Sequence, residues 1–168
     1  MEYIIAQIVG IIAFGLLSYS YFKKEKKQIL FLQILAYIAF TIHYYLLSGI
    51  TGAVCNILGL IALVIIYLCD KHQYKNKKVL IIGMIPIIVT ISLITYQDIF
   101  SIFPILASSL TIASFLTSKE RIIRGIGITS AVCWLVYAVV LHSIVSIVFE
   151  IITLIFVTSA FVKNEKKD

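Results

Sequence analysis

The chain has 168 residues, of which 61% are hydrophobic and 13% are charged, and its formal net charge is +6. Soluble globular domains carry about 25% charged residues, so this composition excludes an ordinary soluble protein. The positive charge does not indicate nucleic-acid binding, because the 14 Lys and Arg residues lie in four short clusters between long apolar stretches. These clusters are Lys23–Lys27, Lys71–Lys78, Lys119–Arg124 and Lys163–Lys167.

Seven apolar stretches are predicted to form membrane-spanning helices, since about 20 residues of helix cross the hydrocarbon core of a bilayer. We expect the first to be a retained helix and not a cleaved signal peptide, because Met1 and Glu2 supply no positive charge before it and no small-residue cleavage site closes it. In chain order the stretches cover residues 3–22, 29–47, 50–69, 79–95, 99–116, 122–141 and 144–162.

The loops between these helices predict one orientation in the membrane. Cytoplasmic loops of membrane proteins carry an excess of Lys and Arg. Seven crossings that begin outside place all four basic clusters on the cytoplasmic side, and they leave Glu2, Asp98 and uncharged turns outside. The sequence therefore predicts a single transmembrane domain over residues 1–168, with its N-terminus outside and its C-terminus in the cytoplasm.

A shift of 94 residues (150 − 56 = 94) superimposes the first three predicted helices on the last three without a gap. Span boundaries, basic loops and short outer turns coincide. The pattern predicts two repeats, over residues 3–69 and 99–162, joined by a linker helix over residues 79–95. Because one helix lies between them, both repeats enter the membrane in the same direction. Transporters built from such parallel repeats have their substrate site near the membrane midplane.

Small and polar residues mark one face of the third helix in each repeat. Asn56 lies on this face in the first repeat, and Glu150 takes its place in the second. A carboxylate at bilayer depth is costly, so Glu150 is expected to face the bundle interior or a wet cavity. The functional interpretation is a site for a substrate, a cation or a proton. The structural interpretation is a tight helix seam with a protonated, hydrogen-bonded acid. The two faces comprise Gly49, Gly52, Asn56, Gly59 and Ser143, Ser146, Glu150, Thr153.

Aromatic residues form a second candidate layer in the middle helices of the repeats. Phe40 and Trp134 are equivalent under the 94-residue shift, and Tyr37 lies one turn before Phe40. Flat apolar rings beside a few orienting polar groups suit a pocket for a small solute. Ordinary core packing would use the same residues.

The first helix of each repeat contains a candidate hinge. Gly10 and Pro104 are equivalent under the shift, and Pro86 lies within the linker helix. Proline cannot complete the helical hydrogen bond one turn back, so a kink is expected at Pro104. These positions are candidates for gating, although proline is also tolerated passively in membrane helices.

The remaining polar and aromatic residues give weaker signals. Tyr44 and Tyr45 are expected to anchor a helix end at the membrane interface. The three histidines lie near helix ends or in a cytoplasmic loop and are weak ligand candidates. Three cysteines without CxxC spacing indicate neither a metal site nor a disulfide framework.

The three-plus-one-plus-three plan and the pairings of Asn56 with Glu150 and of Phe40 with Trp134 resemble the SWEET sugar facilitators and their half-sized bacterial relatives, the SemiSWEETs (MtN3/PQ-loop-like proteins). The resemblance implies that Asn56, Glu150, Trp134 and Phe40 or Tyr37 line a solute site. The Pro-Gln motif of that family is absent and one of its paired asparagines is replaced by Glu150. These departures favour a cationic or proton-coupled solute over a sugar.

Nearly the whole chain is more closely similar to the YgjV-type family of bacterial inner-membrane proteins. The resemblance implies the same helical plan in a bacterial cytoplasmic membrane and adds no substrate. It rests on Ala6–Phe14, His43–Gly49, Gly52, Asn56, Cys133–Trp134, Ser143–Ile144 and Glu150.

These observations predict an all-α transporter or facilitator for a small polar solute, in which two three-helix units alternate access around Asn56 and Glu150. Its partners would be the lipid bilayer and the solute, without nucleic acid, cofactor or metal. An enzyme is not expected, because no nucleophile–base or metal constellation lies at membrane depth. The rival interpretation is a structural or regulatory membrane protein that transports nothing.

Overall fold

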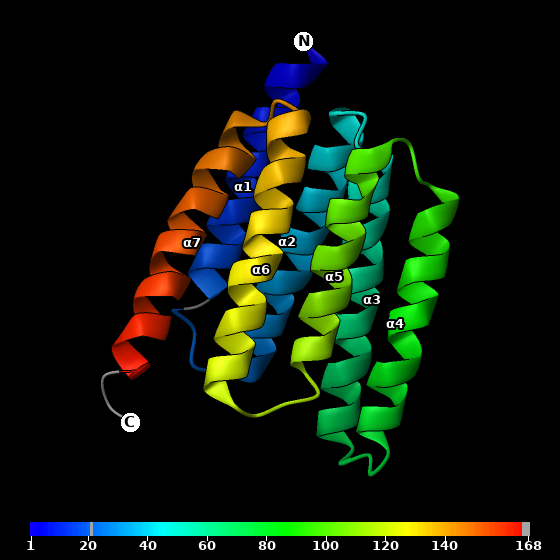
Figure 1. Ribbon diagram of the computed structural model, residues 1–168, viewed down its shortest axis with the longest axis vertical. Coiled ribbons are helices and arrows are strands. Elements are labelled where there is room, and N and C mark those ends of the chain that lie inside the picture. The colour runs from blue at the N-terminus through cyan, green and yellow to red at the C-terminus, as the bar shows by residue number, and fades with distance from the viewer. Residues whose placement is uncertain (21, 166–168) are drawn as a thin grey trace.

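A computed structural model describes residues 1–20 and 22–165 (Figure 1). The described residues form seven α-helices and one short 3-10 turn, η1, and contain no β-strand. The fold is therefore all-α, as predicted. The elements are α1 (Glu2–Ser20), α2 (Lys26–Leu46), α3 (Ile50–Lys71), α4 (Lys77–Ile94), η1 (Ile99–Ser101), α5 (Ile102–Ser114), α6 (Glu120–Val140) and α7 (Ile144–Glu165).

Six of the described helices are long and apolar enough to cross a membrane, and α5 is shorter. Within hydrocarbon a helix satisfies every backbone group internally, which explains why these Ile- and Leu-rich stretches fold as helices. The predicted helix over residues 99–116 is divided between η1 and α5. Asp98 is the reason for the division, because its carboxylate accepts hydrogen bonds from Phe100 N and Ser101 N and so starts a tight turn.

Two of the turns at the N-terminal end of the bundle have the same construction. Ser48 follows α2 and His142 follows α6, and both adopt left-handed backbone conformations, with φ of 60° and 52°. The next residue donates a backbone hydrogen bond five residues back, from Gly49 N to Tyr44 O and from Ser143 N to Ala138 O. This closure satisfies the last carbonyl groups of the helix within the turn.

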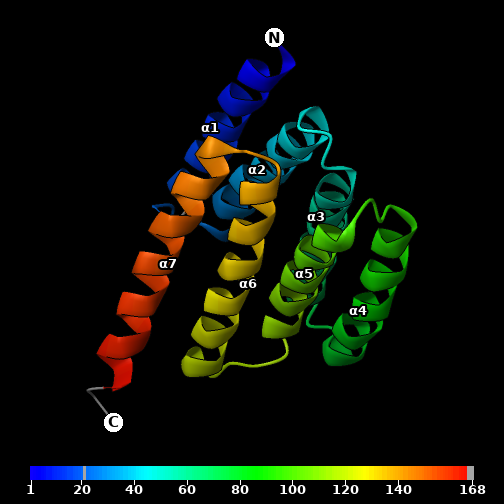
Figure 2. The ribbon, with the colours of Figure 1, turned by 45° about the horizontal axis from the view of Figure 1, so that its top comes forward.

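The helices pack side by side in a closed order. Within the chain α1 contacts α2, α2 contacts α3, α5 contacts α6, and α6 contacts α7. Contacts of α3 with α5 and of α1 with α7 close these six helices into a ring (Figures 1 and 2). Helix α4 lies outside the ring against α3 and α5, held by apolar side chains around Ile66, Ile81 and Ile112.

The charged loops gather at one end of the bundle. The turns after α1, α3 and α5 lie at the lower end in Figure 1, opposite the N-terminus. Two ion pairs are found there, between Lys77 and Asp70 at 2.6 Å and between Arg124 and Glu120 at 2.9 Å. Of the fourth basic cluster, Lys166 and Lys167 lie outside the described residues. The outer surface of the ring exposes large apolar side chains such as Ile11, Val148 and Ile155, as contact with lipid requires.

Candidate functional site

A buried histidine links three helices near the end of the bundle that carries the N-terminus. His43 of α2 has no exposed surface. Its Nδ1 donates to the carbonyl oxygen of Ala6 in α1 at 2.7 Å, since a carbonyl oxygen can only accept. Its Nε2 lies 3.0 Å from Ser143 Oγ and 2.9 Å from Ser146 Oγ in α7. We call this group, Ala6, His43, Ser143 and Ser146, the His43 seam.

The hydrogen bonds of the His43 seam can all be formed by a neutral imidazole. With the hydrogen on Nδ1, the neutral ring has a lone pair on Nε2. Ser143 Oγ donates to Ser146 Oγ at 2.9 Å, which leaves the Ser146 hydroxyl to donate to Nε2. Every polar atom of the ring is therefore satisfied inside the protein, as a buried polar group requires.

Gly10 makes room for this histidine. A Cβ atom built on Gly10 would lie 2.8 Å from His43 Nδ1. The structure thus places Gly10, which the sequence marks as a hinge candidate, in close contact between α1 and α2. Its neighbour Gln7 reaches α7, where its Oε1 accepts from Val145 N at 3.0 Å.

A second seam joins α6 to α3 at the same depth. Tyr137 is 2% exposed, and its hydroxyl accepts a hydrogen bond from Gly52 N at 3.2 Å. Cβ atoms built on Gly52 and Gly49 would lie 2.5 Å from Tyr137 Cε1 and 2.8 Å from its hydroxyl oxygen. We call Tyr137, Gly49 and Gly52 the Tyr137 seam. Only glycine lets this ring lie flat against the α3 backbone.

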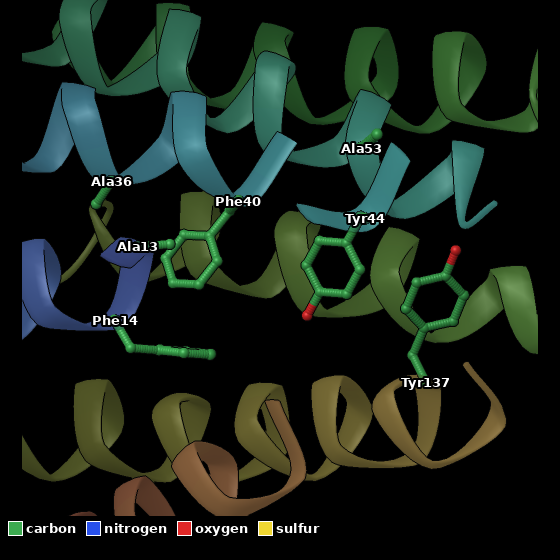
Figure 3. Close-up of a cluster of buried hydrophobic side chains, with 7 residues drawn as sticks. All are labelled: Ala13, Phe14, Ala36, Phe40, Tyr44, Ala53 and Tyr137. Atoms are coloured by element: carbon green, nitrogen blue, oxygen red, sulfur yellow. The ribbon is translucent and has the colours of Figure 1, made fainter. Parts of the chain in front are cut away.

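An aromatic layer fills the ring of helices below the two seams. Tyr44 of α2 stacks on Trp134 of α6, with ring centroids 5.3 Å apart, and lies 5.8 Å from the ring of Tyr137. Figure 3 shows Tyr44 reaching away from its own helix, beside Phe40 and in line with Tyr137. The expectation that Tyr44 anchors the membrane interface is wrong, because only 3% of it is exposed. Tyr45, the next residue, is 64% exposed.

Glu150 lies at the edge of this aromatic layer. It is 9% exposed and stands on α7 one turn beyond Ser146. Tyr44 interacts with both residues, by a hydrogen bond to Ser146 and electrostatically with Glu150. No hydrogen bond or ion pair joins Glu150 to any other residue that the structure describes. A buried carboxylate without a partner is rare and needs an explanation.

The other predicted site residues are distributed around the ring. Asn56 is 5% exposed, and its Nδ2 donates to Gly52 O on its own helix at 2.9 Å. Phe40 packs edge-on against Phe14 at 4.6 Å. Tyr37 packs against Gly59, where an added Cβ would lie 3.0 Å from the ring. The predicted grouping around Asn56 and Glu150 stays a prediction, whereas Tyr44 and Trp134 do lie together.

The two prolines differ in their positions. Pro104 is fully buried in the first turn of α5, where its missing N–H has no intrahelical partner to lose. Pro86 lies inside α4 and is exposed. The expected kink at Pro104 is therefore replaced by a helix start, because Pro104 is the third residue of α5 and lies within its first turn. Its role as a hinge stays a prediction.

The structural role of His43 was not predicted from the sequence. Its burial follows from contacts with α1 and α7, which lie 37 and 100 or more residues away in the chain. The one available signal is the 94-residue shift, which aligns His43 with Tyr137. Two polar rings at equivalent positions in otherwise apolar helices would have indicated a shared structural role.

The six membrane-length helices and the apolar outer surface define a polytopic helical membrane protein. The chain belongs to the Imp-YgjV family of bacterial inner membrane proteins, whose family model matches residues 4–168. The predicted family and the bacterial inner membrane are thereby confirmed. No curated protein and no solved structure matches the chain.

Proposed function

We propose that this protein is a SWEET-like transporter or facilitator that moves a small polar solute across the inner membrane, and not an enzyme. The observation that carries the proposal is Glu150, an acid nine-tenths buried among the helices without a hydrogen-bonding partner among the described residues. Ionisable residues at membrane depth mark substrate or ion pathways, because their cost in stability is otherwise unexplained.

The transport mechanism rests on two units, α1–α3 and α5–α7, joined by α4. The helix contacts support this division, since each is matched by another under the 94-residue shift. The contact of α1 with α2 corresponds to that of α5 with α6. The contact of α2 with α3 corresponds to that of α6 with α7. The contact of α1 with α7 corresponds to that of α5 with α3. Such a pattern is expected of parallel repeats about an axis along the membrane normal.

Individual side-chain contacts between the units support the same symmetry. The bond from Tyr3 Oη to His142 O, 2.9 Å, matches the bond from Gln97 Nε2 to Ser48 O, 2.9 Å. The contact of Gln7 with Val145 likewise matches that of Ser101 with Thr51. The contact of Phe14 with Phe149 matches that of Ser108 with Cys55. The His43 seam matches the Tyr137 seam.

We infer seven crossings, with the N-terminus outside and the C-terminus in the cytoplasm. This orientation places the described basic loops inside, as the positive-inside rule requires. The fifth of these crossings consists of η1 and α5, which together span roughly 25 Å by helix geometry. A segment a few Å shorter than the hydrocarbon core is accommodated at modest cost, and here α5 is enclosed by α3, α4 and α6.

In this orientation we infer a conformation that is closed to the outside. The hydrogen bonds between the two units, among the described residues, all lie at the outer end. Opening outward would break the His43 and Tyr137 seams and form new contacts between the inner ends of the units. Alternating access then consists of rocking the units about the level of Asn56 and Glu150.

Glu150 couples the movement to a proton or a cation. Its titratable neighbour is Tyr44 on α2, whose ring in turn lies beside His43 on the same helix and Tyr137 on α6. Helix α1 meets this stretch of α7 with Phe14, which stacks on Phe149. His43 is already bonded on both ring nitrogens. Exchange of charge with the solution is therefore left to the carboxyl group.

Counterflow in proteoliposomes tests the proposal. Labelled sugars, nucleosides, amino acids and small cations are presented to the wild type and to Glu150→Gln. We expect accumulation of at least one solute, lost or made insensitive to pH in the variant. The control is Asp98→Asn, which removes an acid at the outer end of the bundle.

The rival function is a structural or regulatory membrane protein. It predicts that Glu150→Gln and Asn56→Ala lower stability and change no flux. The transporter predicts that Glu150→Gln stays monodisperse in detergent and loses flux or its pH dependence. If both variants transport like the wild type, the assignment of the site is wrong.

A further inference from the structure

The surroundings of Glu150 restrict the charge of the solute. No ion pair joins its carboxyl group to another described residue, whereas ion pairs join Lys77 to Asp70 and Arg124 to Glu120. The imidazole of His43, which contacts α7 one turn away from Glu150, has its Nδ1 on the Ala6 carbonyl oxygen and its Nε2 on serine hydroxyls. A negatively charged solute would meet an unscreened acid here, which is unfavourable in a low-dielectric interior.

Aromatic faces complete the environment. Tyr44, which interacts with Glu150, stacks on Trp134 with 26° between the ring planes, and Tyr137 lies against both rings. The face of an aromatic ring attracts a cation through its quadrupole, most strongly for tryptophan. A carboxyl group beside a tyrosine that itself stacks on a tryptophan is a combination suited to protonated amines and quaternary ammonium groups.

From this combination we infer that the transported solute is a small organic cation, whose charged group binds the Glu150 carboxylate and whose apolar part lies against Tyr44 and Trp134. The inference deepens the proposed transport function and rests on it for placing Glu150 in the solute pathway. A neutral sugar would need several hydrogen-bonding groups at this level, and the Asn56 amide already donates to its own helix.

Binding of the cation at Glu150 would couple its transport to protons. A proton and an organic cation would compete for the same carboxylate, so each would displace the other. Such competition makes the protein an exchanger, in which release of the cation on one side accompanies protonation of Glu150. Cation affinity would then fall as the pH falls.

Trp134 allows binding to be measured without a label, because it is the only tryptophan in the chain. The full chain in detergent micelles is titrated with choline, tetramethylammonium and guanidinium, and its tryptophan emission is recorded. Each cation is paired with a neutral compound of similar shape, choline with 3,3-dimethylbutan-1-ol. We expect a saturable change with at least one cation and none with the neutral compounds. Glu150→Gln should weaken the binding at least tenfold, and Glu150→Asp should retain most of it.

The outcomes separate this inference from the proposed function. Equal responses to charged and neutral compounds, unchanged cation affinity in Glu150→Gln, or no saturable response to any cation would overturn the inference. Accumulation of a sugar in the counterflow assay without cation binding would overturn it and leave the transport function standing. Saturable, Glu150-dependent cation binding without any flux would support the site and contradict transport. Size-exclusion profiles of the variants identify any loss of binding that results from misfolding.

Discussion

The His43 seam and the Tyr137 seam occupy equivalent places in the two halves of the ring, yet they use different chemistry. On one side an imidazole bonds to two serine hydroxyls. On the other side a phenol lies against two glycines and accepts from a backbone N–H. Where the α2 ring is small, α7 provides side chains to meet it. Where the α6 ring is large, α3 provides none. The comparison shows that two helices can keep the same spacing when a larger side chain on one helix is matched by a smaller residue on the other.

The largest loss of stability is expected when the Tyr137 seam is overfilled. In Gly52→Ala the new methyl group would lie 2.5 Å from the ring of Tyr137, which has no space to move because it is 2% exposed. Overpacking of this kind costs about 1–3 kcal/mol. Thermal unfolding in detergent, followed by loss of the monodisperse size-exclusion peak, measures the change.

The matched control for this substitution is Gly15→Ala, where nothing lies within 4 Å of the new methyl group. It should be neutral or stabilising, because alanine has the higher helix propensity by about 1 kcal/mol. Gly10→Ala, with 2.8 Å to His43 Nδ1, should resemble Gly52→Ala. Equal stability of Gly52→Ala and Gly15→Ala would show that the Tyr137 seam is looser than the structure indicates.

Removing the ring of the His43 seam should have a somewhat smaller effect. His43→Ala leaves the Ser146 hydroxyl without its acceptor and opens a space between three helices. An unsatisfied buried polar group costs about 1–3 kcal/mol. His43→Gln, which can still bond to the serines, should recover part of the loss in the same unfolding assay. His72→Ala, at an exposed loop position, serves as the control and should unfold like the wild type.

A milder change separates the hydrogen bond of the Tyr137 seam from its packing. Tyr137→Phe keeps the ring and removes only the acceptor of the Gly52 N–H, at 3.2 Å. The expected loss is about 1 kcal/mol, the usual net contribution of one hydrogen bond. Tyr45→Phe, at a residue that is 64% exposed, should change nothing measurable. A loss in Tyr137→Phe as large as in Gly52→Ala would mean that the hydroxyl, and not the shape of the ring, holds the seam.

The smallest change in stability is expected at Glu150, below both seams. Glu150→Gln removes an ionisable group but no hydrogen bond or ion pair of a described residue, so the unfolding temperature should stay close to that of the wild type or rise, because a buried carboxylate is costly to desolvate. The seams would then hold the fold, and Glu150 would be kept for another reason. Destabilisation comparable to His43→Ala would contradict this division and favour a structural acid.

The helices and their order were predictable because membrane insertion depends on local properties of the chain. Apolar length sets the spans, and basic loops set the sides, so the predicted boundaries differ from α2, α3, α4 and α6 by only a few residues. Helix α5 is the exception. The start of a helix depends on capping, and the Asp98 carboxylate together with Pro104 shortened it in a way that hydropathy does not record.

The candidate site was only partly predictable, because the sequence alone does not say which helices become neighbours. The burial of Glu150 was expected from the cost of an acid in a membrane. The roles of His43 and Tyr44 were not, because His43 is bonded to α1 and α7 and Tyr44 is stacked on α6.

The sequence by itself determined that this is an all-helical inner-membrane protein, which of its segments are helical, and that Glu150 is an exceptional residue. Each of these features follows from the free energy of transferring a side chain or a segment from water into lipid. Only the tertiary structure decided that six helices close into a ring, that Tyr44 points inward where Tyr45 points outward, and that glycine is required opposite Tyr137. These depend on contacts between residues far apart in the chain, and such contacts exist only after the helices have packed.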